Sequence, residues 1–133
     1  MTLRIVRLGS PRRTNEGLRI GTVRRPPRGV PKSEYASRNI YDVWLPNLSP
    51  SESLLKSARE AVAVADDRSW RSFVRHFRAE MSAAENRALL DTLAALSHHA
   101  DFSVGCYCED ESHCHRSVLR DLLAARGAAI ARD

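Results

Sequence analysis

The sequence has few cysteines, almost no lysine and no long apolar run. Its three cysteines, an odd number gathered in one stretch, do not fit the disulfide framework of a small secreted domain. No segment approaches the roughly 18 consecutive apolar residues that span a bilayer, so we expect no membrane segment. The opening MTLRIVRLGS lacks the apolar stretch of a signal peptide. These absences predict a cytoplasmic protein with reduced thiols.

The charge that is present is mainly arginine. The chain carries a net charge of +5, and its arginines gather near the N-terminus and around the pair Pro26-Pro27. A guanidinium offers paired donors that match phosphate and carboxylate, so these clusters favour an anionic partner: a small molecule, a nucleotide or a nucleic acid. Solvated surface charge is the alternative for the N-terminal cluster. The chain has no zinc-finger, basic-zipper or aromatic RNA-binding motif to indicate sequence-specific recognition.

Hydrophobic periodicity predicts strands interleaved with helices. Strands are expected at residues 3–8, 18–23, 40–45, 102–108 and 128–131. Capping signals predict helices that open at Ser49 and Ser82, and apolar spacing predicts two more, through Trp70–Met81 and Val118–Leu123. This order predicts a single compact α/β domain over residues 1–133, with a mostly parallel sheet flanked by helices in a Rossmann-like layering.

Two stretches are expected beyond the carboxyl ends of strands, where parallel sheets bind ligands. The first is the stiff loop RRPPRGVP, residues 24–31, which carries Arg25, Arg28 and Gly29 directly after a predicted strand. The second is CYCEDESHCHRS, residues 106–117, which holds all three cysteines and two of the five histidines. We therefore place the candidate site in these two stretches.

One interpretation of CYCEDESHCHRS is a zinc site. Zinc takes thiolate and imidazole ligands readily, and His113 lies among four further candidates, Cys106, Cys108, Cys114 and His115, which form the alternative metal site. The spacing argues against a metal, because familiar zinc modules separate two ligand pairs by a dozen or more residues. A domain of this length also folds without a metal. We therefore expect no cofactor, with zinc as the alternative.

A second interpretation is a reactive cysteine. Cys114 is expected at the start of the last helix, where free amide groups and the helix dipole stabilise a thiolate. His113 and His115 are the candidate acid–base partners of this thiol. Together with Arg116 they would lower the pKa of Cys114.

A third interpretation is an anion pocket without covalent chemistry. Arg116 and the first amides of the last helix would hold a phosphate or carboxylate, together with Arg24, Arg25 or Arg28. The stretch has no glycine-rich phosphate loop, and an arginine-lined pocket does not need one. The structural alternative is that Cys106 and Cys108 share one face of a strand and pack as small apolar side chains.

Two sequence blocks carry a family resemblance. Gly17–Ile20, followed by Arg25 and Pro27-Arg28-Gly29, forms the first block, and Cys106, followed by an acidic turn and Cys114-His115-Arg116, forms the second. In these blocks the chain resembles the YeaO-like group of domain-of-unknown-function family 488, and the likeness runs nearly end to end. The resemblance implies a compact α/β domain and places the candidate site at these signature positions.

The chain departs from that family at Cys108, where many relatives carry a glutamate, so any acid–base role of that carboxylate would be unfilled or move to Glu109 or Glu111. Our leading hypothesis is an enzyme that acts on a phosphorylated small molecule, a nucleotide or a nucleic acid. The arginines would bind the anion, and Cys114 with a neighbouring histidine would supply the chemistry. The alternative is a non-enzymatic adaptor module that binds zinc or nucleic acid.

Overall fold

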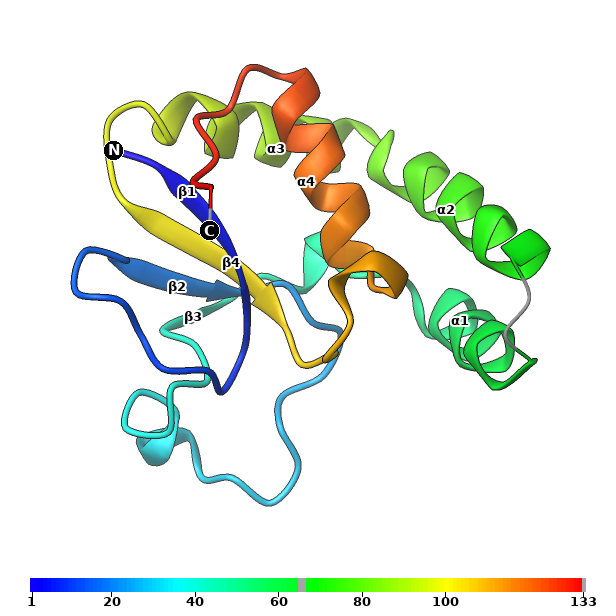
Figure 1. Ribbon diagram of the computed structural model, residues 1–133, viewed down its shortest axis with the longest axis horizontal. Helices are drawn as coiled ribbons and strands as arrows, with labels where there is room; N and C mark the ends of the chain where they lie inside the picture. Colours follow the sequence, from blue (N-terminus) through cyan, green and yellow to red (C-terminus); the bar gives the residue numbers. More distant parts are fainter. Residues whose placement is uncertain (65–66, 133) are drawn as a thin grey trace.

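The fold is built on a four-stranded parallel sheet (Figure 1). The computed structural model describes residues 1–64 and 67–132, with residues 61–64 described through their backbone alone. The strands are β1 (Leu3–Arg7), β2 (Leu18–Gly21), β3 (Val43–Trp44) and β4 (Phe102–Cys106). Their spatial order is β1-β4-β2-β3, and every pairing is parallel. The predicted α/β class and parallel sheet are confirmed.

The described helices supply the apolar partner of this sheet. They are α1 (Glu52–Val64), α2 (Asp67–Met81), α3 (Ala84–Leu96) and α4 (His115–Ala125), with short 3-10 turns η1 (Lys32–Glu34), η2 (Pro46–Leu48) and η3 (Glu111–His113). Side chains from all four α-helices join one core with Ile5, Ile20 and Val104 of the strands. These helices therefore pack on one face of the sheet, and none of those described is long and apolar enough to cross a bilayer.

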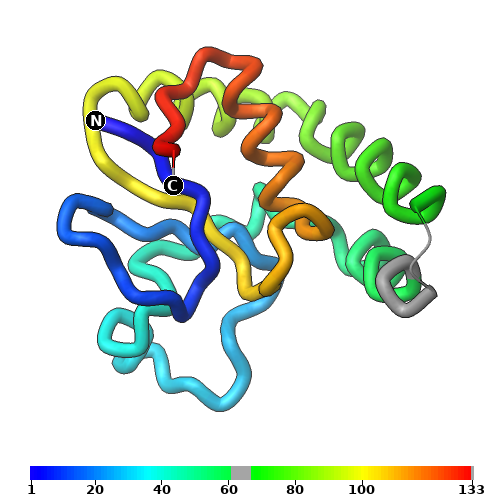
Figure 2. The backbone as a smooth tube through the Cα atoms, viewed as in Figure 1, coloured from blue at the N-terminus to red at the C-terminus, as the bar shows by residue number. Residues whose placement is uncertain are grey.

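The opposite face is covered by loops rather than by helices (Figure 2). It buries Arg19 of β2, which donates to the Glu16 carboxylate at 2.7 and 2.9 Å and to the carbonyl oxygens of Ser10 and Asn39. Ser103 of β4 donates to the same carboxylate at 2.8 Å. Burial alone would raise the pKa of Glu16, but the hydrogen bonds from Arg19 and Ser103 outweigh burial and hold that pKa below its usual value.

The third and last predicted strands are shorter than expected. Within residues 40–45 the strand is Val43–Trp44, flanked by backbone hydrogen bonds from Asp42 and Leu45 to β2, while Tyr41 is buried against the sheet. A Cβ built on Gly21 would lie 2.3 Å from the Tyr41 ring, so the glycine makes room for this packing. Residues 128–131 contribute a single bridge, between Ile130 and Leu3.

The two predicted helix caps also differ from the sequence expectation. α1 is capped by Ser51, whose hydroxyl accepts the amide of Leu54 at 3.3 Å, while the Ser49 hydroxyl donates to a preceding carbonyl. The prediction of a cap at Ser82 is wrong. Ala83 is the N-cap of α3 and makes no side-chain cap bond, while the Ser82 hydroxyl donates back to the carbonyl of Ala79 at 2.6 Å.

Candidate functional site

The two predicted stretches meet at the edge of the sheet formed by the carboxyl ends of the strands. β4 is a central strand buried over its whole length, and the cysteine loop (residues 107–114) leaves from its carboxyl end. The arginine–proline loop (residues 24–31) follows β2 at the same edge. A cavity of about 1040 Å³ lies between them. Its lining includes Arg24, Arg25, Arg28, Glu52, Arg59, Cys106, Cys108, His113 and His115.

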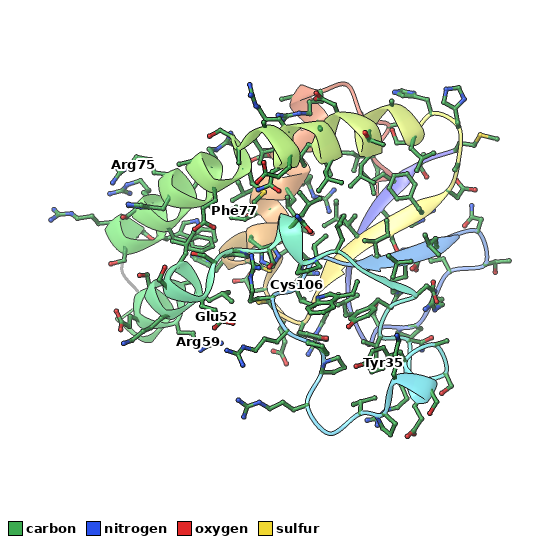
Figure 3. The ribbon with its side chains drawn as sticks, turned by 180° about the vertical axis from the view of Figure 1, so that it is seen from behind. Tyr35, Glu52, Arg59, Arg75, Phe77 and Cys106 are labelled. Carbon is green, nitrogen blue, oxygen red and sulfur yellow. The ribbon has the colours of Figure 1, made fainter. Side chains whose placement is uncertain are left out.

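The charges that line the cavity are mainly positive. Arg25 pairs with Glu52 at 2.8 Å, and Arg24 is held by the carbonyl oxygens of Ser49 and Pro50. The hydrogen bond from Arg25 lowers the pKa of Glu52, which therefore stays ionised. Figure 3 shows Glu52 and Arg59 on α1, on the side of the molecule where Cys106 ends its strand. Arg28 is exposed and makes no hydrogen bond or ion pair with any described residue.

Beside the cavity lies a thiol–imidazole cluster, formed by Cys106, Cys108, Cys114 and His115. Cys106 ends β4 and Cys108 follows two residues later, so their side chains leave on the same side, with their Sγ atoms 3.5 Å apart. Cys114 is the N-cap of α4, as predicted for a helix start, and its Sγ lies 3.3 Å from that of Cys106. All three thiols are free. Cys106 and Cys114 are buried, whereas Cys108 is exposed and lines the cavity.

Hydrogen bonding within the cluster separates the pKa values of its thiols. The S–H of Cys106 donates to Cys108, which raises the pKa of Cys106 and lowers that of Cys108. The positive charge of Arg116 lowers the pKa of Cys108 further. Cys108 is therefore the thiol of the cluster that most readily carries negative charge.

His115 is held in one tautomer with a free ring nitrogen toward the thiols. Its Nε2 lies 2.7 Å from the carbonyl oxygen of Thr22. Because a carbonyl oxygen can only accept, Nε2 carries a proton, and in the neutral imidazole Nδ1 is the nitrogen with the lone pair. Nδ1 lies 3.7 Å from Cys114 Sγ, and the Phe77 ring packs edge-on against the imidazole. The ligand atoms of Cys106, Cys114 and His115 lie within 4.8 Å of one another, so together they could hold a metal ion.

Arg116 is buried and does not line the cavity. Its side chain is 3% exposed, and its Nη2 donates to the carbonyl oxygen of Cys108. Its Nε has no hydrogen-bond partner, and no carboxylate within the described ranges 1–64 and 67–132 pairs with it. A buried guanidinium without a carboxylate is costly, so its nearest source of compensating charge is a thiolate of the neighbouring cluster.

His113 lines the cavity and is held by a carboxylate. Its Nδ1 lies 3.1 Å from Asp110 Oδ2, and its ring packs against Trp70 with 5.3 Å between centroids. Hydrogen bonds from Ser112 and His113 lower the pKa of Asp110, which remains an anion. An imidazole whose second nitrogen is fixed by a carboxylate is a common arrangement for general acid–base chemistry.

The predicted site residues therefore divide into two groups. Arg25, Arg28, His113 and His115 line the cavity together with Cys106 and Cys108. Cys114 and Arg116 are buried and outside its lining. Gly29 is also outside the lining, and its positive φ of 71° lets the chain turn after Arg28.

Three contributors were not identified from the sequence. Asp110 precedes His113 by three residues in a turn, which is a spacing that places two side chains together. Arg59 belongs to an exposed turn of α1, and nothing in its helical pattern distinguishes it from solvated charge. Thr22 acts through its backbone carbonyl, which leaves no residue-type signal in the sequence.

The fold and the site define the class of this protein. It is a small parallel α/β domain with a thiol–imidazole cluster beside an arginine-lined cavity. Comparison with known families matches residues 3–127 to DUF488-N3a, described as the active DUF488-N3 subclade. The chain belongs to this family, which confirms the predicted resemblance at the level of DUF488. Neither the curated proteins nor the solved structures gave a match to the chain.

Proposed function

We propose that the chain is an enzyme that acts on a phosphorylated substrate. This substrate is a small molecule, a nucleotide or the end of a nucleic acid, and it binds in the cavity between the arginine–proline loop and the cysteine loop. One observation carries the proposal: four arginines and an exposed thiol line the same cavity. The description of the matching family as an active subclade supports an enzyme over an inert adaptor.

The arginines are the phosphate-binding groups. Arg24 is occupied by backbone carbonyls and Arg25 by Glu52, so Arg28 and Arg59 are the residues we assign to the first contact with a phosphate. Among the described residues that line the cavity, Glu52 is the one carboxylate, and it forms an ion pair with Arg25. The cavity volume is at the upper end of the range of small-molecule sites, which suits a nucleotide-sized ligand.

Cys108 is the thiol that we expect to meet the substrate. Cys114, the candidate from the sequence, is 2% exposed, and we assign it to the support of the cluster. The Cys108 thiolate would use an electron pair of Sγ to form a bond to phosphorus, while the bond from phosphorus to the leaving oxygen breaks and that oxygen keeps the electron pair. His113, held by Asp110, would donate the proton that the leaving group takes up, since the Nε2 proton of His115 is committed to Thr22.

Alkylation of the metal-free protein tests the pocket without knowledge of the substrate. Iodoacetate is an anion and iodoacetamide is its neutral counterpart, so their rate ratio at Cys108 reports the local charge. We expect Cys108 to react before Cys106 and Cys114, and Arg28→Ala to lower the iodoacetate to iodoacetamide ratio several-fold. Peptide mass spectrometry identifies the modified cysteine.

The matched control is Arg75→Ala, which removes an exposed arginine from α2 outside the cavity lining. This variant should leave the ratio unchanged. A ratio that Arg28→Ala does not alter, or that both variants alter equally, would contradict the anion pocket. Protection of Cys108 by AMP and by a 5′-phosphorylated oligonucleotide then separates a small-molecule substrate from a nucleic acid.

Activity itself is tested with a panel of phosphate esters and nucleotides, with Cys108→Ser as the negative control. The proposal predicts turnover that this variant loses. Three free thiols this close would cross-link under oxidising conditions, so the proposed activity suits a reducing compartment such as the cytoplasm.

A further inference from the structure

We propose that the thiol–imidazole cluster is a zinc site, with Cys106, Cys108, Cys114 and His115 as its four ligands. The metal site stands on its own geometry and charge, independently of the proposed substrate. The spacing that argued against zinc in the sequence is overcome by the fold, because a strand end, a loop and a helix start bring the ligands together.

Three distances between ligand atoms are close to those of a four-coordinate zinc site. A Zn–S bond of about 2.3 Å in tetrahedral geometry separates two sulfur atoms by about 3.8 Å. In the cluster, Cys106 Sγ lies 3.3 Å from Cys114 Sγ and 3.5 Å from Cys108 Sγ, and Cys114 Sγ lies 3.7 Å from His115 Nδ1. Shifts of a few tenths of an ångström would let Cys106, Cys114 and His115 bind the ion, and Cys108, which lies outside this group of three, would turn toward it from its exposed position.

The imidazole already has the outer contact that zinc-binding histidines use. A ligating histidine donates its other ring N–H to a carboxylate, a backbone carbonyl or water, which fixes the tautomer and orients the ring. His115 Nε2 donates to the carbonyl oxygen of Thr22 at 2.7 Å, and Nδ1 is the nitrogen nearest the thiols. His113, two residues before His115, instead contacts Asp110, so the two histidines do not compete for the ion.

The charges also balance. Zinc carries two positive charges and three thiolates carry three negative charges, so the bound site has one net negative charge. Arg116 is 3% exposed, contacts the Cys108 carbonyl and has no carboxylate partner among the described residues. It therefore supplies the one buried positive charge that a site with three cysteines and one histidine needs.

Zinc at this site would keep Cys108 in its thiolate form, because a thiol that coordinates zinc is deprotonated. Cys106, Cys114 and His115 are buried and would hold the ion, while Cys108 faces the cavity as the exchangeable fourth ligand. This link to catalysis rests on the proposed function, whereas metal binding does not.

Metal titration of the full chain tests the site without a substrate. The protein is purified under reducing conditions without chelator, its zinc is quantified, and the metal-free form is titrated with Zn²⁺ against a chromophoric chelator. The absorption spectrum on titration with Co²⁺ reports the type of ligand, because thiolate coordination adds sulfur-to-cobalt charge-transfer absorption. We expect one zinc per chain and tetrahedral, thiolate-ligated cobalt.

Two variants show which residues hold the ion. Cys108→Ser changes the exposed ligand, so the fold should persist, and it should weaken zinc binding at least about 10-fold, since even outer contacts of a zinc site contribute that much. His113→Gln is the matched control and should leave zinc affinity within about 2-fold. A wild-type chain that binds no stoichiometric zinc, a cobalt spectrum without thiolate bands, or a loss of binding in His113→Gln equal to that in Cys108→Ser would overturn the proposal. Loss of iodoacetate selectivity with intact zinc binding would instead contradict the proposed function alone.

Discussion

Two arginines are buried among the described residues, and their surroundings differ. Arg19, on the loop-covered face of the sheet, is fully buried and donates through all three guanidinium nitrogens, to the Glu16 carboxylate and to two backbone carbonyls. Arg116, next to the thiol–imidazole cluster, is almost as buried but donates to one carbonyl, and its Nε has no partner in the part of the chain that the structure describes.

This difference in hydrogen-bond partners indicates that Arg19 has a structural role and Arg116 a functional one. A buried charge with a full set of partners holds a fold in one arrangement. A buried charge without a carboxylate persists where another negative group compensates it, and the charge of Arg116 acts on the thiol of Cys108, whose carbonyl oxygen it contacts. We therefore assign Arg19 to stability and Arg116 to the chemistry of the cluster.

The largest expected effect is on the Arg19 side of this comparison. Arg19→Met leaves the Glu16 carboxylate buried without its cation, which should cost about 3–5 kcal/mol of unfolding free energy. Urea unfolding of the metal-free protein measures this cost. Combining it with Glu16→Leu should recover part of the loss, because no isolated charge remains. A single variant as stable as the wild type would show that Glu16 finds other partners.

The next effect is on the Arg116 side. Arg116→Gln should weaken zinc binding by about 10–100-fold, the range seen when an outer contact of a zinc site is lost. Competition with a chromophoric chelator measures the affinity. Zinc binding by folded Arg19→Met should stay within about 2-fold of the wild type. Equal zinc affinities in Arg116→Gln and the wild type would remove the functional assignment of Arg116.

A smaller effect is expected from acid. The pKa of Glu16 in the folded protein lies below its ordinary value of 4.5, so its stabilising contribution is complete above that value and is lost as the pH falls through the folded pKa. The urea midpoint should therefore drop from about pH 5 downward. Glu16→Gln should be less stable near neutral pH and should flatten this drop. A variant with the same acid profile as the wild type would assign the drop to other carboxylates.

The smallest effect is expected at the exposed pair of Arg25 and Glu52. Exposed ion pairs contribute little to stability, so Arg25→Ala should leave the urea midpoint unchanged. It should, however, lower the iodoacetate to iodoacetamide ratio at Cys108, since Arg25 lines the cavity. A drop in the urea midpoint without a change in this ratio would show that the pair contributes to stability and not to the charge of the cavity.

Much of the fold follows from local patterns in the sequence. Alternating apolar residues locate β1, β2 and β4, and helical spacing locates α2 and α4, because each of these elements places its large apolar side chains mainly on one face. The strand expected at residues 40–45 shrinks to two residues, and the cap expected at Ser82 is absent. The first difference accompanies packing of Tyr41 against Gly21 of a distant strand, and the second accompanies a local bond from the Ser82 hydroxyl to the carbonyl of Ala79.

The candidate site follows from the sequence only in part. The shared side of Cys106 and Cys108 follows from their spacing of two, and the helix start at Cys114 follows from the pattern after it. The burial of Arg116 and the carbonyl of Thr22 that orients His115 depend on how β2 and α4 pack. The sequence therefore identifies the candidate ligands, but their arrangement around one point depends on the tertiary fold.

X-ray absorption at the zinc edge tests the cluster most directly, because it counts the ligand atoms around the ion. The geometry predicts three sulfur atoms at about 2.3 Å and one nitrogen at about 2.0–2.1 Å. Cys108→Ser should replace one sulfur with a lighter atom. A first shell made of oxygen and nitrogen alone would contradict a zinc centre built by Cys106, Cys114 and His115.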